Sequence, residues 1–395
     1  MQSLRIAMVA PCPFPASQGT QVFIGQLARA LRKRGHRIHL VTYHYGDKNL
    51  TFQGPVHKAW RLPISHKLGS GPSPQKPFFD ALLAIQLNRV VQRQRAHIIH
   101  AHNYEGALVG LAIRRLRKVP LVFHTHNTMT HELPSYSRTK FGLHIARWLG
   151  RLLDYQLPWR TDACIAITPE IATFVRKRGV APDRIWTIPP AIEANQFEVG
   201  GKKASPKGKD AVPRLLYAGN LDNYQNFGLV LKSLREVVTH HPRCLLEVVT
   251  NSSPTRILHQ VERMGLWERV HITQTTSFQV MRGLLEECDL ALCPRISPYG
   301  FPIKLLNYLA AGKPVVICQG SANSIQHLVN GWVVRDDDAH EFATAIMSLL
   351  NDFGLRRRLS ENARKTVRDE FTWDQWVPRY EEVYQKTLER WSWRK

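Results

Sequence analysis

Short apolar runs alternate with helix-length segments along most of this chain, and this alternation constrains the fold more than any other feature. The runs are apolar enough to be buried on both faces, which is typical of strands in a parallel sheet. A β-α-β rhythm of this kind predicts doubly wound parallel sheets. The runs of the first half are RIAMVA, RIHLVTY, AHIIHAH, PLVFHTH and DACIAIT, and those of the second half are RLLYAGN, CLLEVVT, RVHIT, DLALCP and KPVVICQ.

The two series are separated by QFEVGGKKASPKGKDAVP, whose Gly, Lys, Ser and Pro content is that of a flexible connector. A length of 395 residues also favours two domains over a single core. We therefore predict an α/β protein with two Rossmann-like parallel-sheet domains that face a central cleft. The predicted parts are a first domain (1–195), a linker (196–212), a second domain (213–371) and a C-terminal helix (372–395) that packs across the domain junction.

The chain is strongly basic, with 54 Lys and Arg against 31 Asp and Glu and a formal net charge of +23. This charge predicts an anionic partner, namely a phosphorylated substrate, an anionic membrane surface or a nucleic acid, unless it is only a solvated basic surface. Because the sequence shows no nucleic-acid recognition motif and no aromatic stacking pattern, we predict no nucleic-acid partner.

Localisation is indicated by the N-terminus and by the cysteines. The N-terminal stretch is read as a first strand rather than a signal peptide, and no apolar run reaches the roughly 18 to 20 residues of a membrane span. The six cysteines include no C-x-x-C pair, and several lie in apolar runs, as small buried thiols do. We predict a cytoplasmic protein that can also lie peripherally at the inner face of the membrane.

The segment SRTKFGLHIARWLGRLLDY combines basic and apolar side chains at helical spacing. Arg138, Lys140, Arg147 and Arg151 accompany Trp148 and several leucines. A helix of this composition can dock on an anionic membrane. The alternative is an amphipathic helix that packs its apolar face against its own sheet.

Histidines follow one another at the ends of two apolar runs. His100 and His102 end the first run, and His124 and His126 end the next. Alternate strand positions share one face, and the carboxyl ends of neighbouring parallel strands meet at one edge, so these side chains are expected to converge. They are read either as a polar site or as structural histidines.

Two segments are candidate metal sites. The histidines between residues 124 and 131 are one of them, and the run Asp336–Asp338, nominally a D-x-D motif, is the other. The aspartates precede an amphipathic helix, where acidic side chains cap the helix and favour its N-terminus. We predict no metal site.

Two helix starts are candidate anion sites. A glycine after the first strand, Gly19, lets the backbone approach a ligand, and a proline at Pro302 suits the first position of a helix whose amides can hold a diphosphate. An ordinary turn glycine and a plain helix start are the alternatives. Lys304 lies in the first turn of the second helix, where its charge opposes the helix dipole. This placement costs stability unless an anion lies there.

The combination of these segments, in this order, resembles the GT-B glycosyltransferases, specifically the retaining enzymes of family 4. The matching segments are PFPASQGTQ, HAHNYEGALVG, HTHNTMTHELPSY, TDACIAITPEIATFVRKRGV, IWTIPPAIE and GFPIKLLNYLAAGKPVV. The resemblance implies transfer of a hexosyl or N-acetylhexosaminyl group from a nucleotide-diphosphate sugar to an acceptor hydroxyl, with retention, without metal and without a further cofactor. The acceptor implied is a glycan or a lipid-linked intermediate in glycan, polysaccharide or glycolipid synthesis, held by the first domain, with the donor held by the second.

The resemblance also assigns roles to individual residues. It places His126 next to the reacting sugar, with His124 as a second candidate, and Glu105 at the acceptor hydroxyl. The residues implied to bind the donor are Gly19, Asn220, Gln225, Tyr299, Gly300, Phe301, Pro302, Ile303, Lys304 and Asn307.

Four of these residues depart from the family pattern. Tyr299 and Asn307 stand where the family has two glutamates, and Asn220 and Gln225 stand where it has an arginine and a lysine that grip the diphosphate. We predict that Lys304, with Arg295 as a second cation, replaces the missing basic pair. A noncatalytic sugar-binding subunit and a GT-B-fold epimerase are the alternatives.

Overall fold

The computed structural model describes residues 2–61, 71, 73–137, 139–197 and 212–393. Contacts divide the chain into two compact units. The first contains Met1–Pro190, Tyr299–Phe301 and Trp373–Lys395, and the second contains Ala191–Pro298 and Pro302–Thr372. The predicted linker (196–212) lies almost wholly outside the described residues, and the predicted domain limits stay predictions.

The first unit is built on a seven-stranded sheet with the strand order β3-β2-β1-β4-β5-β6-β7. All neighbouring strands are parallel. Its strands are β1 (Arg5–Ala10), β2 (Arg37–Thr42), β3 (Val56–Lys58), β4 (Ile98–His102), β5 (Leu121–Thr125), β6 (Ala163–Ala166) and β7 (Ile185–Thr187). The order reverses between β1 and β4, and ligands of doubly wound folds bind at the carboxyl ends of the strands beside such a switch point.

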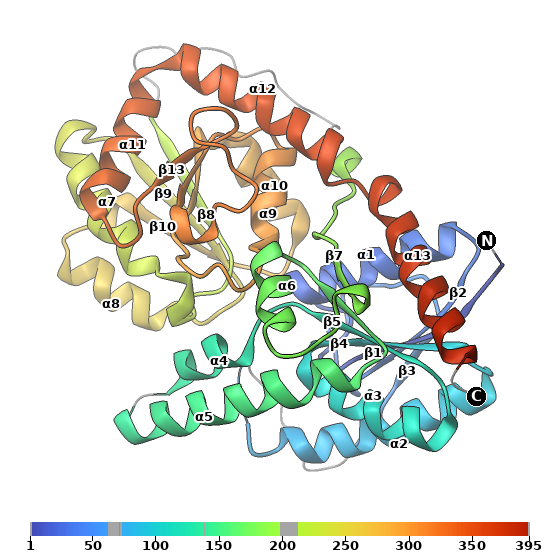
Figure 1. Cartoon of the computed structure of the whole chain (residues 1–395). Helices are drawn as coiled ribbons and strands as arrows, with labels where there is room; N and C mark the ends of the chain where they lie inside the picture. The colour runs from blue at the N-terminus through green and yellow to red at the C-terminus, as the bar shows by residue number, and fades with distance from the viewer. Residues whose placement is uncertain (1, 62–70, 72, 138, 198–211, 394–395) are drawn as a thin grey trace. The chain divides into compact units, whose positions relative to one another are not determined.

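Helices cover both faces of this sheet, which is why its central strands β4 and β5 are buried along their whole length. Helices α1 and α13 lie on one side, and α2 and α3 lie on the other (Figure 1). The helices of the first unit are α1 (Gly19–Lys33), α2 (Lys76–Arg93), α3 (Asn103–Arg117), α4 (Met129–Glu132), α5 (Lys140–Gln156), α6 (Pro169–Arg176) and α13 (Trp373–Ser392). The predicted C-terminal helix thus exists, and its contacts group it with the first unit.

The second unit repeats the architecture with a six-stranded parallel sheet in the order β10-β9-β8-β11-β12-β13. Its strands are β8 (Arg214–Ala218), β9 (Leu245–Thr250), β10 (Val270–Gln274), β11 (Leu290–Cys293), β12 (Val315–Cys318) and β13 (Trp332–Val334). The switch point lies between β8 and β11. The predicted fold of two Rossmann-like parallel-sheet domains is confirmed.

Helices α7 and α11 pack together on one side of the second sheet, and α10 lies on the other side (Figure 1). Side chains from α7 and α11 fill the core between helices and strands, among them Leu231, Leu234, Phe342 and Ile346. The helices of the second unit are α7 (Phe227–His240), α8 (Thr255–Arg263), α9 (Phe278–Glu287), α10 (Ile303–Ala310), α11 (Ala339–Asn351) and α12 (Phe353–Glu370).

Two local predictions are confirmed and one is corrected. Asp338 is the N-cap of α11 and accepts a hydrogen bond from the Glu341 amide, so the acidic run caps a helix, as proposed. All six cysteines are free and buried. Pro302, however, is the N-cap of α10 rather than its first residue, because its ψ of 93° is not helical.

No helix among the described residues is both long enough and apolar enough to span a bilayer.

Candidate functional site

Four imidazoles converge at the carboxyl ends of β4 and β5, beside the switch point of the first sheet. The two strands pair in a register that sets His102 opposite His124. His100 stacks on His102, and His124 stacks on His126, each pair with ring centroids 4.5 Å apart. The convergence predicted from alternate strand positions is therefore found.

Hydrogen bonds join the histidines across the strands. His100 Nε2 lies 3.3 Å from His124 Nδ1, and His102 Nδ1 lies 3.1 Å from His126 Nε2. The hydroxyl of Tyr384 on α13 lies 2.7 Å from His100 Nδ1. His126 is thus oriented by its hydrogen bond to His102 and by its stacking on His124, and those two rings are in turn held by His100.

Exposure separates His126 from the other three histidines. His100, His102 and His124 are 0% exposed, whereas His126 is 9% exposed. The ring of Phe23 on α1 packs edge-on against His124 and His126. Of the two candidates for a catalytic histidine, His126 is therefore the one with surface through which a substrate can touch it.

Burial keeps this cluster uncharged. Loss of solvation lowers the pKa of both His100 and His126 to about 3, with His126 adding a repulsive effect on His100. Burial, reinforced by the neighbouring imidazoles, also moves the pKa of His102 and of His124 well below the usual value. At neutral pH His126 is therefore a neutral ring that can position a hydroxyl by hydrogen bonding.

Three of the histidines have a geometry that could hold a metal ion. One ligand atom from each of His100, His102 and His124 lies within 4.8 Å of the others. Within the described part of the chain, His102 Nε2 and His124 Nε2 have no hydrogen-bond partner. Both ring nitrogens of His100 are already hydrogen-bonded, however, so a metal ion would have to displace Tyr384 or His124 from that ring.

Mild acid is expected to destabilise the first unit because of these histidines. Their pKa values are lowered in the folded protein, so the unfolded chain, with histidines at 6.5, binds more protons as the pH falls below that value. Each histidine then costs up to about 1.4 kcal/mol per pH unit. Between pH 6.5 and 5.5, where the unfolded histidines are only partly protonated, the cost is about 1 kcal/mol each, or about 4 kcal/mol for four. Unfolding midpoints measured from pH 7.5 to 5 should fall steeply below pH 6.5.

The slope against pH, rather than the absolute stability, is the diagnostic quantity. The variant His102→Gln should lose part of that slope even if it is less stable at every pH. A midpoint that stays level between pH 7.5 and 5 would show that the cluster is accessible to protons in the folded state.

Glu105 lies in the first turn of α3, at the same edge of the sheet. Its Oε1 forms an ion pair with Lys76 Nζ on α2 at 3.1 Å. Asp80, one turn along α2, accepts a hydrogen bond of 2.7 Å from the Tyr43 hydroxyl, and burial is the main reason that its pKa is raised to about 6, with Glu105 adding to the rise. Sequence reasoning missed Lys76 and Asp80, because only the tertiary fold brings the start of α2 to the end of β2.

Tyr299, Gly300 and Phe301 group with the first unit. Tyr299 stacks on His131 with ring centroids 3.7 Å apart, and Gly300 forms an isolated antiparallel bridge with Asn127. Gly300 has a φ of 137°, a value that a residue without Cβ adopts readily. These residues therefore meet the segment that follows β5.

Gly19, the remaining candidate in this unit, is the first residue of α1.

In the second unit, Lys304 lies in the first turn of α10, and its amine reaches the end of β8. Lys304 Nζ donates a hydrogen bond of 3.0 Å to Gln225 Oε1 and lies 3.9 Å from the ring centre of Tyr217. A Cβ on Gly219 would lie 3.4 Å from that amine, which is an ordinary contact distance, so the amine lies directly beside the end of β8. Lys304 on α10 thus places a positive charge beside Gln225, the position at which the family pattern has a lysine.

The neighbours of Lys304 make its charge costly in the unliganded protein. Burial lowers the pKa of Lys304 to about 8, Cys293 opposes this shift, and the positive charge of Arg295 adds to it. The guanidinium of Arg295 lies 5.5 Å from the ring centre of Tyr224. Two cations thus lie at the β8–β11 switch point, near the N-terminus of α10, an arrangement that favours an anion.

Tyr308, one turn after Lys304, holds α10 against the end of β8. Its hydroxyl accepts a hydrogen bond of 2.8 Å from the Ala218 amide and donates one of 3.3 Å to the Ala218 carbonyl. Asn220 is held nearby by Asp222 and Tyr224, to which its Nδ2 donates. Ile303 and Asn307 are half-buried on α10. The donor candidates Asn220, Gln225 and Lys304 thus lie around one strand end.

Comparison with known proteins identifies the fold and the class of enzyme. The profile of Glycosyltransferase Family 4 matches residues 17–196, and that of Glycosyl transferases group 1 matches residues 202–366. The chain belongs to the family 4-like GT-B glycosyltransferases. An uncharacterized glycosyltransferase of Methanocaldococcus jannaschii is 22% identical to it over 98% of this chain and 99% of the relative.

Solved structures of other GT-B proteins superpose on nearly the whole glycosyltransferase. Sucrose-phosphate synthase from Thermosynechococcus elongatus gives a TM-score of 0.80 at 16% identity, covering 98% of this chain and all (100%) of that one. HepE of Anabaena, solved in complex with UDP and glucose, gives a TM-score of 0.75 at 18% identity, covering 97% of this chain and 100% of that one. At these identities the likeness shows the fold.

Proposed function

We propose that this glycosyltransferase transfers a hexosyl or N-acetylhexosaminyl group from a nucleotide-diphosphate sugar to an acceptor hydroxyl. The reaction retains the anomeric configuration and needs neither metal nor another cofactor. The acceptor is a glycan or a lipid-linked intermediate of glycan, polysaccharide or glycolipid synthesis.

The position of the Lys304 amine carries this proposal. It lies at the switch point of the second sheet, 3.0 Å from Gln225 Oε1 and close to Gly219, where the phosphates of a nucleotide find a cation and a helix N-terminus together. The complex of HepE with UDP and glucose supports a donor of the UDP-sugar kind.

In the first unit, His126 and Glu105 supply the groups that meet the reacting sugar and the acceptor. A neutral His126 donates or accepts a hydrogen bond at a donor hydroxyl without adding charge next to an oxocarbenium-like transition state. Glu105, tied to Lys76, orients the acceptor hydroxyl.

A thermal-shift panel of UDP-, GDP-, ADP- and dTDP-sugars tests the donor class. A ligand that binds only the folded state should raise the midpoint by about 5 °C or more at a hundredfold excess over its Kd. One base should stand out from the other three. No shift with any of the four would contradict the proposal.

Turnover then separates the enzyme from its alternatives. Release of the nucleoside diphosphate with an acceptor, undiminished by a chelator, supports metal-independent transfer, and NMR of the product reads its anomeric configuration. Binding without any release would favour a noncatalytic sugar-binding subunit, which the replacements at Tyr299 and Asn307 make a specific alternative. Conversion of the donor to its epimer would favour the epimerase.

A further inference from the structure

Helix α5 turns an apolar face away from the unit that it belongs to. Phe141 is 78% exposed and Trp148 is 65% exposed, and both are among the most exposed large apolar side chains of the described residues. The outward face repeats at intervals of three and four residues, as one stripe of a helix does. The exposed apolar side chains of α5 are Phe141, Ile145, Trp148, Leu149, Leu152 and Tyr155.

The opposite face of α5 attaches the helix to the protein. Gly150 and Asp154 are its buried residues. Asp154 accepts hydrogen bonds from the amides of Met129 and Thr130 at 2.9 and 2.8 Å, and a Cβ on Gly150 would lie 2.5 Å from the Met129 carbonyl oxygen. The helix is therefore fixed through its small and polar face. The alternative raised by the sequence, an apolar face packed against its own sheet, is wrong.

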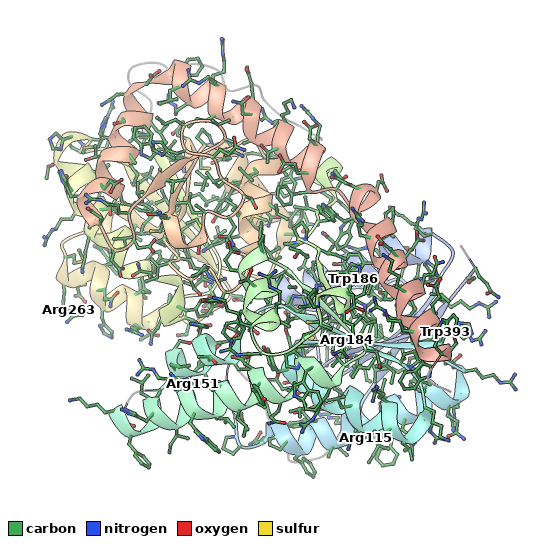
Figure 2. The ribbon with its side chains drawn as sticks, in the orientation of Figure 1. Arg115, Arg151, Arg184, Trp186, Arg263 and Trp393 are labelled. Atoms are coloured by element: carbon green, nitrogen blue, oxygen red, sulfur yellow. The ribbon has the colours of Figure 1, made fainter. Side chains whose placement is uncertain are left out.

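The exposed part of α5 is basic as well as apolar. Lys140, Arg147 and Arg151 are all exposed. On a helical wheel the three cluster along one flank of the apolar stripe. The one acidic residue of α5, Asp154, is buried against α4 and does not belong to the exposed face. Figure 2 draws the side chains that project from α5 and labels Arg151 on this helix.

We propose that α5 docks this protein on an anionic lipid surface, lying in the plane of the interface. Its aromatic and aliphatic side chains enter the boundary between headgroups and acyl chains, while Lys140, Arg147 and Arg151 meet lipid phosphates. Aromatic rings such as those of Trp148 and Tyr155 are favoured at this depth. The inference does not depend on the proposed transfer reaction.

Charge decides between a membrane and a second copy of this chain. If two copies met through α5, Arg147 and Arg151 of each would approach the like charges of the other, and the exposed face of α5 offers no carboxylate to pair with them. An anionic bilayer supplies that missing negative charge.

Sedimentation with lipid vesicles tests the proposal on the full-length protein. The protein should sediment with vesicles of phosphatidylglycerol and phosphatidylcholine at about 50 mM salt, much less with pure phosphatidylcholine, and less again at about 500 mM salt. Equal sedimentation with neutral and anionic vesicles would overturn it.

Two pairs of matched variants locate the binding surface. Arg147→Glu with Arg151→Glu should lower vesicle affinity by about thirty-fold or more, from about 1 kcal/mol per basic residue. The control Arg115→Glu with Arg263→Glu makes the same change in net charge at two exposed arginines of other helices, both labelled in Figure 2. Equal losses in both pairs would mean that overall charge, not α5, binds the vesicle.

The apolar contribution is tested in the same way. Phe141→Ser with Trp148→Ser should lower affinity by about tenfold or more, because both side chains lose apolar area that enters the bilayer. The control, Trp267→Ser with Trp393→Ser, removes two other exposed tryptophans and should leave affinity unchanged. If the parent protein is a dimer that Phe141→Ser with Trp148→Ser splits into monomers, the face is a self-association surface and the proposal is wrong.

A fluorescent probe reports the depth of insertion. Because all six native cysteines are buried, a cysteine introduced by Trp148→Cys can be labelled selectively with an environment-sensitive dye. Its emission should shift to the blue with anionic vesicles and be quenched by spin-labelled lipid, whereas a probe at Trp267→Cys should do neither. An unchanged spectrum at position 148 would contradict insertion of α5.

Discussion

Replacing His126 by alanine is expected to lower kcat by about two orders of magnitude while donor affinity stays within a few-fold. His126 is the least buried member of the histidine cluster, at 9% exposed. A group that acts mainly in the transition state lowers kcat rather than raising KM. Steady-state kinetics, together with a thermal shift by the donor, would measure both quantities in the same preparation.

His124→Ala is the matched comparison, since this neighbour belongs to the same cluster but is 0% exposed. Its loss of activity should accompany a loss of stability, with less effect on kcat at a temperature where the variant is folded. Unchanged turnover in His126→Ala would end the assignment. An equal loss in His124→Ala, with a normal unfolding midpoint, would transfer the role to that residue.

The pH profile gives a second check on His126. Burial lowers the pKa of this ring to about 3, so it stays neutral throughout the range in which an ordinary histidine titrates. Titration of His126 should therefore cause no decline of kcat/KM near pH 6.5. If the parent enzyme shows such a decline, it should persist in His126→Ala. A decline that disappears in His126→Ala would show that the imidazole exchanges a proton in the folded enzyme.

Replacing Lys304 by alanine is expected to weaken donor binding by about ten- to a hundred-fold. A charge-assisted contact to a diphosphate contributes about 1.5 to 3 kcal/mol, and the Lys304 amine lies where the family pattern predicts such a cation. Titration calorimetry with the best donor would measure the change. Lys232→Ala, at an exposed lysine of α7, is the control and should bind like the parent.

The protonation of Lys304 adds a pH dependence with a definite sign. Its pKa in the unliganded protein is about 8, so the charged form declines above that pH and donor affinity should decline with it. In Lys304→Ala that part of the dependence should be absent. Unchanged donor affinity in the variant would return Lys304 to a structural role and leave the missing basic pair unexplained.

The same residue should destabilise the unliganded protein. Between about pH 8 and the usual lysine value of 10.5, the unfolded chain holds a proton that the folded chain has lost, so stability from this residue rises as the pH rises. Below pH 8 the full cost of holding the charge in this partly buried position is present. Lys304→Ala should therefore unfold at a slightly higher temperature than the parent at pH 7 without ligand.

Sequence reasoning reached part of the candidate site and missed the rest for identifiable reasons. The histidines at positions 100, 102, 124 and 126 could be placed together because parallel strand ends share an edge and alternate residues share a face. Lys76 and Asp80 could not be found, because they join Glu105 and Tyr43 through contacts between segments far apart in the chain. Their spacing carries no local signal.

The sequence by itself determined the repeated β-α-β order, and with it the parallel sheets and their buried strands, because hydrophobic periodicity and helix caps are local properties. Tertiary structure alone decided which way an amphipathic helix faces. The composition of α5 defines an apolar side, but burial of Gly150 and Asp154 against α4 turns that side outward. The contact between the Lys304 amine and Gln225 also depends on tertiary structure, because it requires α10 to lie at the end of β8, where Tyr308 holds it.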